Sequence, residues 1–163
     1  MKNFLSNIGN FIRRIIDFFY PPFRHIVSLQ VFRYGMSGGL NLLFDWLLYF
    51  FIFNYLLHQQ MLSLGFVTFS AHIAPFVIKF PITLLSGFLL QKYVTFSYAT
   101  HTRGRIQLVR YLSVVALNLL LNYAGLKFFV EIAHFFPSIA NVVVSLICTV
   151  ISYIAQKRFT FKN

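Results

Sequence analysis

Two ionisable side chains lie inside stretches of this sequence that are otherwise apolar. Asp45 follows Arg33 by twelve residues in one apolar run, and Lys79 precedes Lys92 by thirteen residues in the next. At about 1.5 Å of rise per helical residue, these charges lie roughly 18 and 20 Å from the basic residues at the ends of their runs. Charged groups inside a membrane pair with one another or mark the path of a polar substrate. The sequence therefore predicts an Asp45–Lys79 ion pair at one level of a membrane.

Amide side chains accompany the two charges at helical spacing. Together they form a predicted polar pathway: Asn41, Asp45, Lys79, Gln91, Asn118, Asn122 and Gln156. Small residues, hydroxyl residues and one further amide extend the stripes, namely Gly38, Thr83, Gly87, Gly125, Asn141, Ser145, Thr149 and Ser152. Such residues either hold helices together by close packing and hydrogen bonds or replace water around a polar substrate in transit. The sequence leaves both interpretations open.

Basic residues recur at one end of the apolar runs. The predicted phosphate-binding set is Arg33, Lys92, Arg110, Lys157 and Arg158. Arginine suits bidentate contact with phosphate, and lysine supplies a mobile point charge. Snorkelling anchors would account for any single member, but not for the Gln-Lys pair that recurs at Gln91 and Gln156. Ordinary anchoring and an anionic-lipid site are the two interpretations of this set.

The side chains of an enzyme site are sparse. The acids Asp17, Asp45 and Glu131 lie at different depths, the five histidines are scattered, and Cys148 is the single cysteine. This pattern lacks the Cys/His spacing of a zinc site, and the sequence has no glycine-rich phosphate loop. We therefore expect no catalysis, no cofactor and no metal. The net charge of +11 does not indicate nucleic-acid binding, because the basic residues end apolar runs rather than line a solvated face.

Composition places these residues in a membrane protein. The 163 residues are 58% hydrophobic and 10% charged, far from the roughly 25% charged residues of a soluble domain, and the mean hydropathy is +0.72. Four runs have the roughly 20 residues that a hydrocarbon core requires, near Tyr34–Leu57, Ala71–Tyr93, Tyr111–Ala133 and Ser138–Gln156. The predicted fold class is an all-α integral membrane protein. Pro75 and Pro81 predict a kink or break in the second run.

The four runs divide into two repeats. Arg33, Asn41 and Asp45 recur as Arg110, Asn118 and Asn122 at a constant offset of 77 residues, and QKYVTF at Gln91–Phe96 recurs as QKRFTF at Gln156–Phe161. We predict repeats over 33–96 and 110–161 within a membrane domain of residues 31–163. Residues 3–19 have apolar and basic faces at helical spacing, so segment 1–30 is predicted to be an amphipathic helix lying in the membrane interface.

Charge distribution predicts the orientation of the spans. Twelve basic residues fall on the side shared by both termini and the middle loop, whereas Lys127 falls on the opposite side. Cytoplasmic loops carry the excess of lysine and arginine. We therefore expect both termini in the cytoplasm and two parallel repeats of two helices each. An outward-facing polar stripe would also favour a homo-oligomer.

At the level of motifs, the sequence resembles the GtrA-like family. The resemblance rests on RYGMSGGLNLLFD at Arg33–Asp45 and on the closing motifs SGFLLQKYVTF and VISYIAQKRFTF. Glutamine at positions 91 and 156 replaces the asparagine expected from the family, and Lys79 is not part of the family pattern. The resemblance implies four spans and a translocase that moves a polyprenyl-phosphate-linked sugar, such as undecaprenyl-phosphate glucose, across a bacterial inner membrane to modify envelope glycans.

Two other functions fit the same residues. One is a membrane subunit that recruits or stabilises a glycosyltransferase without transporting anything. The other is a small proton-coupled exporter, for which Asp45 would supply the acid, although the basic residues at the span ends argue against cationic drugs. The expected partners are accordingly a polyprenyl-phosphate-linked sugar, membrane lipid, a possible glycosyltransferase and further copies of the chain.

Overall fold

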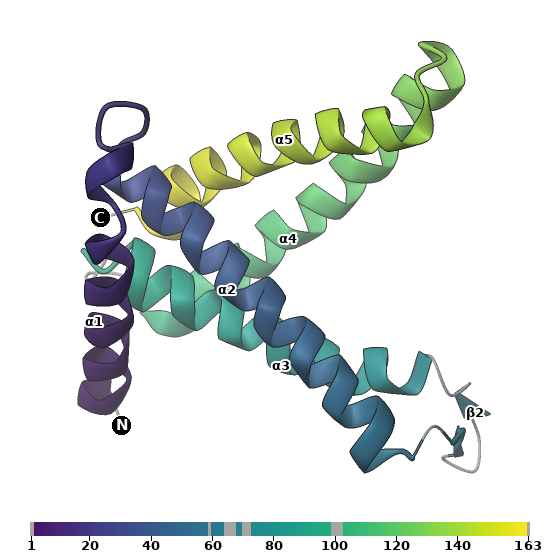
Figure 1. The fold of residues 1–163 in the computed structure, drawn as a ribbon, viewed down its shortest axis with the longest axis horizontal. Coiled ribbons are helices and arrows are strands. Elements are labelled where there is room, and N and C mark those ends of the chain that lie inside the picture. The colour runs from purple at the N-terminus through teal and green to yellow at the C-terminus, as the bar shows by residue number, and fades with distance from the viewer. Residues whose placement is uncertain (1, 59, 64–67, 70–72, 99–102, 163) are drawn as a thin grey trace. The chain divides into compact units, whose positions relative to one another are not determined.

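The computed structural model describes residues 2–58, 60–63, 68–69, 73–98 and 103–162 and divides into two compact units. Unit 1 is Met1–Ser97 and unit 2 is Tyr98–Asn163 (Figure 1). Each unit contains a hairpin of two long helices. The boundary between the units falls between the two sequence repeats.

Unit 1 is an N-terminal helix followed by a helical hairpin. Its elements are α1 (Lys2–Phe18), the 3₁₀ turn η1 (Pro21–Phe23), α2 (Leu29–Phe51), the π-helical turn η2 (Ile52–Leu56), α3 (Ile73–Leu90) and the π-helical turn η3 (Gln91–Thr95). Between α2 and α3, β1 (Leu62–Ser63) pairs antiparallel with β2 (Thr68–Phe69). This short strand pair lies in the connection between the first two spans.

Unit 2 is a second hairpin. It consists of α4 (Gly104–Lys127), the π-helical turn η4 (Phe128–Ile132), α5 (Pro137–Ala155) and the π-helical turn η5 (Gln156–Thr160). Pro137 occupies the first helical position of α5, where its missing N–H would have no helical partner in any case. The two helices pack together through Gly125, since a Cβ at this position would lie 2.9 Å from a Val144 methyl group.

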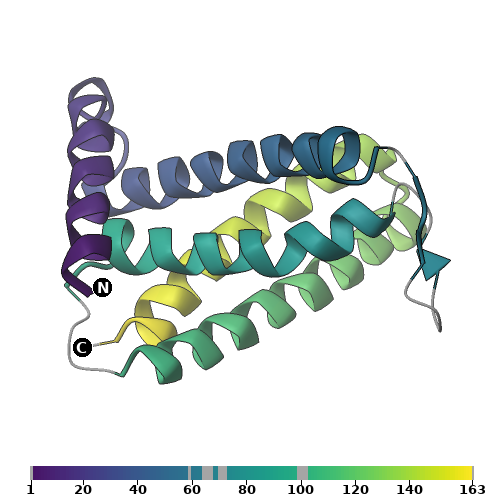
Figure 2. The same cartoon turned by 90° about the horizontal axis from the view of Figure 1, so that it is seen from below.

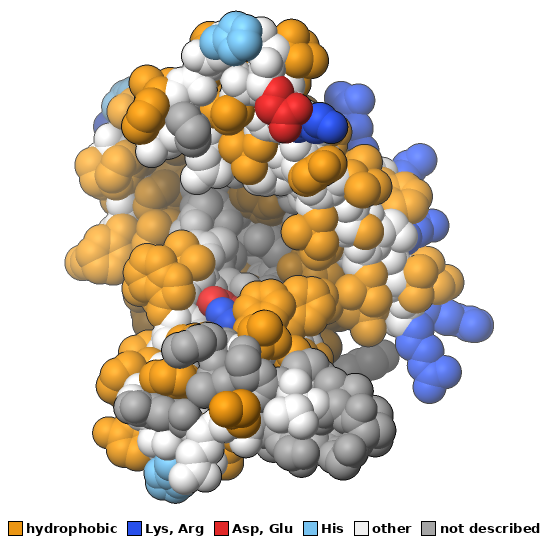
Figure 3. Space-filling view, turned by 90° about the vertical axis from the view of Figure 1, so that its right-hand side faces the viewer, with side chains coloured by type: hydrophobic (Ala, Val, Ile, Leu, Met, Phe, Trp, Pro, Cys, Tyr) orange, Lys and Arg blue, Asp and Glu red, His pale blue; other side chains and the backbone are white. Residues whose placement is uncertain are grey.

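All four predicted spans are confirmed as long apolar helices. Leu29–Leu56, Ile73–Thr95, Gly104–Ile132 and Ser138–Thr160 are each long and apolar enough to cross a membrane. Large hydrophobic side chains remain exposed along them, including Trp46, Leu47 and Leu120, and Figure 3 shows many hydrophobic side chains on the face in view. The protein is therefore an all-α, multi-pass membrane protein.

The helix boundaries differ from the predicted ones in an informative way. The first span starts at Leu29 rather than Tyr34, because the Ser28 hydroxyl accepts a hydrogen bond from the Val31 amide and caps the helix. Arg33 therefore lies inside a helix and not at its start. The second span is not broken, since α3 runs continuously through Pro81, and a kink at the prolines stays a prediction. Pro75 lies in the first turn, where proline is tolerated.

Helix α1 confirms the predicted amphipathic helix and is anchored against the hairpin. Figure 2 shows it crossing the ends of α2 and α3 rather than running along them. Ile16 is fully buried, and Gly9 approaches Tyr93 so closely that a Cβ there would lie 2.6 Å from the Tyr93 Cβ. A glycine is therefore required where α1 touches η3. The placement of α1 in the membrane interface stays a prediction.

Candidate functional site

Three polar contacts join the facing helices of unit 1. Thr95 donates to the Ser37 hydroxyl at 3.2 Å, Ser86 donates to the Asn41 carbonyl oxygen at 2.6 Å, and the Lys79 ammonium donates to Asp45. On α2 the three contributors are spaced four residues apart, so they lie on one helical face. The predicted stripe of Asn41 and Asp45 is confirmed as a face directed at α3. Its partners Ser86 and Thr95, and the third α2 member Ser37, were not anticipated.

The Asp45–Lys79 ion pair predicted from matching depths is confirmed. Lys79 retains only 8% of its surface exposed, and its ammonium lies 5.4 Å from the ring centroid of Tyr49 and 5.6 Å from that of Phe76. Aromatic ring faces attract cations, so two rings and one carboxylate together stabilise a lysine inside an apolar span. Asp45 itself is partly exposed.

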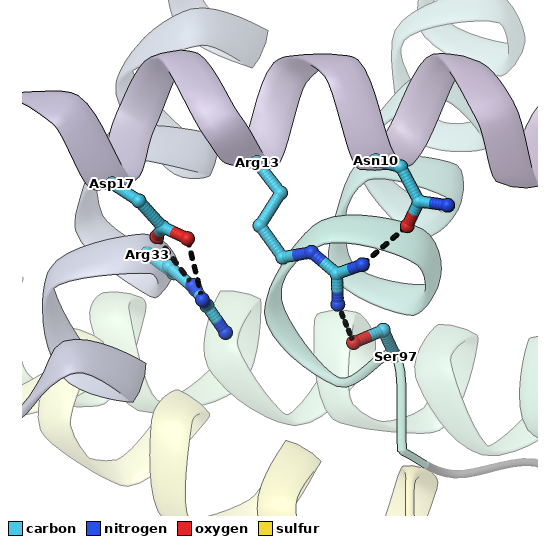
Figure 4. A network of polar contacts seen from close by, with 5 residues as sticks. All are labelled: Asn10, Arg13, Asp17, Arg33 and Ser97. Carbon is cyan, nitrogen blue, oxygen red and sulfur yellow. Dashed lines mark hydrogen bonds and ion pairs between the residues drawn. The ribbon is translucent and has the colours of Figure 1, made fainter.

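A second network ties α1 to the hairpin (Figure 4). Both Arg33 Nε and Arg33 Nη2 donate to the Asp17 carboxylate at 2.7 Å, which is a bidentate ion pair. Arg13 donates to the Ser97 hydroxyl at 2.6 Å and to Asn10. Sequence analysis placed Arg33 at a phosphate site and gave Asp17 no partner. The sequence feature that could have indicated this ion pair is Asp17 itself, an isolated acid on the basic face of the N-terminal helix.

In the described part of unit 2, valines stand at two of the positions that make the polar contacts of unit 1. The position equivalent to Lys79 is Val144, which packs on Gly125, and the position equivalent to Ser37 is Val114. Asn118 donates to the Val114 carbonyl of its own helix at 3.0 Å, while its buried Oδ1 has no hydrogen-bond partner in the described part of the chain. Among the residues described in unit 2, Asn118 is thus held by its own helix and not by the facing one.

The polar stripe of α5 lies on its surface. Asn141, Ser145 and Thr149 are exposed, and only Gln156 at the end of the stripe is buried. The Thr149 hydroxyl donates to the Ser145 carbonyl at 2.8 Å, a bond within the helix. This stripe presents polar groups along an otherwise apolar helix.

The repeated Gln-Lys motif forms the same local structure in both units. Gln91–Thr95 and Gln156–Thr160 are single π-helical turns, closed by bonds from the Phe96 amide to the Gln91 carbonyl at 2.8 Å and from the Phe161 amide to the Gln156 carbonyl at 2.9 Å. In both turns the glutamine, threonine and final phenylalanine are buried. Single π-helical turns often occur at functional sites. In each motif the lysine thus points away from the core, which the glutamine, threonine and final phenylalanine fill.

The basic residues of unit 2 border a cleft at the end of α5. Its volume is about 380 Å³, and it is lined by Tyr98, Lys157, Arg158, Phe161 and Lys162. We call it the basic cleft. Lys162 was not in the predicted phosphate-binding set.

The remaining members of the predicted set have neighbours of their own. Arg110 donates to the Phe159 carbonyl at 3.2 Å and stacks at 5.4 Å from the Phe159 ring centroid. Lys92 lies 5.6 and 5.7 Å from the ring centroids of Phe88 and Tyr93. The structure brings Lys157 and Arg158 together, and the convergence of all five residues stays a prediction.

Comparison with known families matches residues 33–161 to the GtrA/DPMS transmembrane domain. The chain belongs to this family. The match starts at Arg33 and ends at Phe161, so it spans both repeats and leaves out α1. Neither the curated proteins nor the solved structures gave a match.

In this GtrA/DPMS domain, the predicted pathway residues differ in their environment. Between α2 and α3, Asn41 bonds to Ser86 and Asp45 pairs with Lys79, and Gln91 is buried as the first residue of η3. Asn118 and Asn122 are half-buried on α4. The described residues contain no cluster of three or more His, Cys, Asp or Glu side chains that could hold a metal ion.

Proposed function

We propose that this GtrA/DPMS protein translocates a polyprenyl-phosphate-linked monosaccharide across the bacterial inner membrane for modification of a cell-envelope glycan. The observation that carries the proposal is the basic cleft at the end of a membrane-spanning helix. Family membership supports the class of cargo. Both termini and the basic cleft would lie on the cytoplasmic side, where the excess of basic residues favours them.

The basic cleft fits a phosphate group at headgroup level. Lys157 and Arg158 are exposed on a π-helical turn whose first and last residues, Gln156 and Thr160, are buried, so the two ends of the turn hold the backbone that carries both charges. The Tyr98 hydroxyl adds a neutral hydrogen-bonding group to the lining. Hydrogen bonds to charged groups contribute about 1.5–3 kcal/mol each, so loss of one cation would weaken phosphate binding about tenfold or more.

Passage of the sugar requires polar groups at membrane depth. The exposed α5 stripe, Asn141, Ser145 and Thr149, supplies amide and hydroxyl groups along one helix, and these would replace water around the sugar hydroxyls. The polyprenyl tail would stay in the bilayer throughout. With no nucleotide site in the sequence, consumption of the sugar on the far side or coupling to an ion would drive net transfer.

Reconstitution into liposomes tests the proposal directly. Polyprenyl-phosphate glucose is placed in both leaflets, and the fraction that an added membrane-impermeant hydrolase can reach is followed with time. The parent protein should render the inner-leaflet lipid accessible, whereas Lys157→Gln and Arg158→Gln should slow this at least tenfold. Lys127→Gln is the matched control, because Lys127 is an exposed lysine at the far end of α4.

Unchanged rates in both cleft variants would show that the phosphate binds elsewhere. A parent protein that fails to move the lipid, but that stabilises a co-expressed glycosyltransferase, would favour the non-transporting subunit instead. The proton-coupled exporter has less support, because Asp45, the acid it would use, is engaged by Lys79.

A further inference from the structure

An apolar groove lies in the corner where α1 crosses the helical hairpin of unit 1. Leu5, Ile8 and Ile12 of α1 form one wall, and Phe44 of α2 and Leu89 of α3 contribute to the other. The groove has a volume of about 230 Å³. Ile8 and Phe44 retain 41% and 40% of their surface exposed, so the groove is open to its surroundings.

The polar groups in this groove satisfy one another. Asn41 and Ser86 are the amide and hydroxyl residues in its lining, and they are joined by their 2.6 Å hydrogen bond. A paired amide and hydroxyl can face an apolar chain without the cost of an unsatisfied polar group. The groove is thus suited to hydrocarbon along its length.

Two basic residues, Lys92 and Arg13, are next in sequence to residues that line the groove. Tyr93 belongs to its lining, and the Lys92 ammonium lies 5.7 Å from the Tyr93 ring centroid. On α1, Arg13 follows the wall residue Ile12 and donates to Ser97, two residues beyond η3. The lining itself contains no acid, and the nearby Asp17 is already paired with Arg33.

We propose that this groove binds an acyl chain of an anionic phospholipid, whose headgroup phosphate lies beside Lys92 and Arg13. These two neighbouring cations favour a negative headgroup, and the corner between a crossing amphipathic helix and a membrane-spanning hairpin admits the chain from the bilayer. The bound lipid fills the space between α1 and the hairpin. This proposal does not depend on the transport function.

The experiment uses the full-length protein in mild detergent, titrated with phosphatidylglycerol or phosphatidylcholine and analysed by native mass spectrometry. Ile8→Trp fills the groove with a larger side chain and should raise the apparent Kd for phosphatidylglycerol at least tenfold. Ile15→Trp is the matched control on the same helix, because Ile15 is similarly exposed at 47% but lies outside the groove. It should change the Kd less than twofold.

Two further variants test whether the loss of binding comes from misfolding and whether the charge selects the headgroup. If Ile8→Trp lowers the melting temperature markedly, Leu5→Trp fills the other part of the same wall and should give the same loss. Lys92→Gln should reduce the preference for phosphatidylglycerol over phosphatidylcholine. The proposal is overturned if both filling variants retain phosphatidylglycerol like the parent, or if the parent binds phosphatidylcholine equally well. Displacement of phosphatidylglycerol by an equal concentration of polyprenyl phosphate would also overturn it, by assigning the groove to an isoprenoid chain.

Discussion

At the scale of single residues, the main contrast is between equivalent positions of the two repeats. Asp45 and Lys79 of unit 1 correspond to Asn122 and Val144 of unit 2. The first pair is ionic and flanked by two aromatic rings, whereas Val144 packs on Gly125. Two similar helix hairpins are therefore held by different forces, charge in one and close packing in the other.

The ion pair leads to a prediction about stability. Removal of one member of a buried pair leaves the other charge uncompensated and costs about 3–5 kcal/mol. Asp45→Asn and Lys79→Met should each lower the free energy of unfolding in detergent, and the double variant should lose less than the sum of the two. A double-mutant cycle with strictly additive losses would show that the two charges are not coupled.

At the scale of elements, α1 is attached to the hairpin by a salt bridge and a close backbone approach. The Asp17–Arg33 pair joins α1 to α2, and Gly9 meets Tyr93 of η3. This ion pair engages the Arg33 guanidinium, which the sequence analysis had assigned to phosphate binding. Helix α1 thus holds Arg33 in place at the start of the matched family domain.

We expect Asp17→Asn to loosen α1 without unfolding the hairpin. Because the Asp17 side chain is about a third exposed, solvent screens the pair, and its loss should cost only about 1 kcal/mol or less. Hydrogen exchange at the α1 amides should nevertheless become faster, while exchange in α3 stays unchanged. Glu131→Gln is the control, since it removes an exposed acid in η4. Identical α1 exchange in the two variants would contradict this role of Asp17.

At the scale of the whole molecule, the chain is two hairpins of the same helical type in sequence order. The turns after η2 and η4 repeat as well, since His58 and His134 both adopt a positive φ, at 47° and 55°, two residues beyond the ends Leu56 and Ile132 of these segments. A left-handed residue at this position is a common way to terminate a helix. The repeat therefore extends from the membrane-spanning helices to the turns that follow them.

The orientation of the hairpins is testable by cysteine labelling in a Cys148→Ser background. His25 and Gln60 are exposed residues before and after the first span. With the termini in the cytoplasm, a membrane-impermeant maleimide should label Gln60→Cys in intact cells and His25→Cys only after permeabilisation. Equal labelling of both sites in intact cells would be inconsistent with a first span that crosses the membrane.

Periodicity and depth predicted the spans and the Asp45–Lys79 pair, because both follow from helix geometry alone. The Asp17–Arg33 pair was not predictable in this way, since it depends on how the chain turns at Pro21 and Pro22. Ser37 was overlooked for a different reason. An isolated hydroxyl in an apolar helix resembles a packing residue until its partner, here Thr95, is known.

The placement of Asp45 and Lys79 on consecutive helices also bears on how the protein enters the bilayer during synthesis. An unpaired Asp or Lys at the centre of an inserting helix costs about 2.5–3.5 kcal/mol. Helices α2 and α3 each carry one such charge, and each charge is neutralised only when the two helices are in contact. We therefore expect α2 and α3 to enter lipid together as a hairpin. Helices α4 and α5 carry Asn122 and Val144 at the corresponding positions, so we expect no such coupling between them.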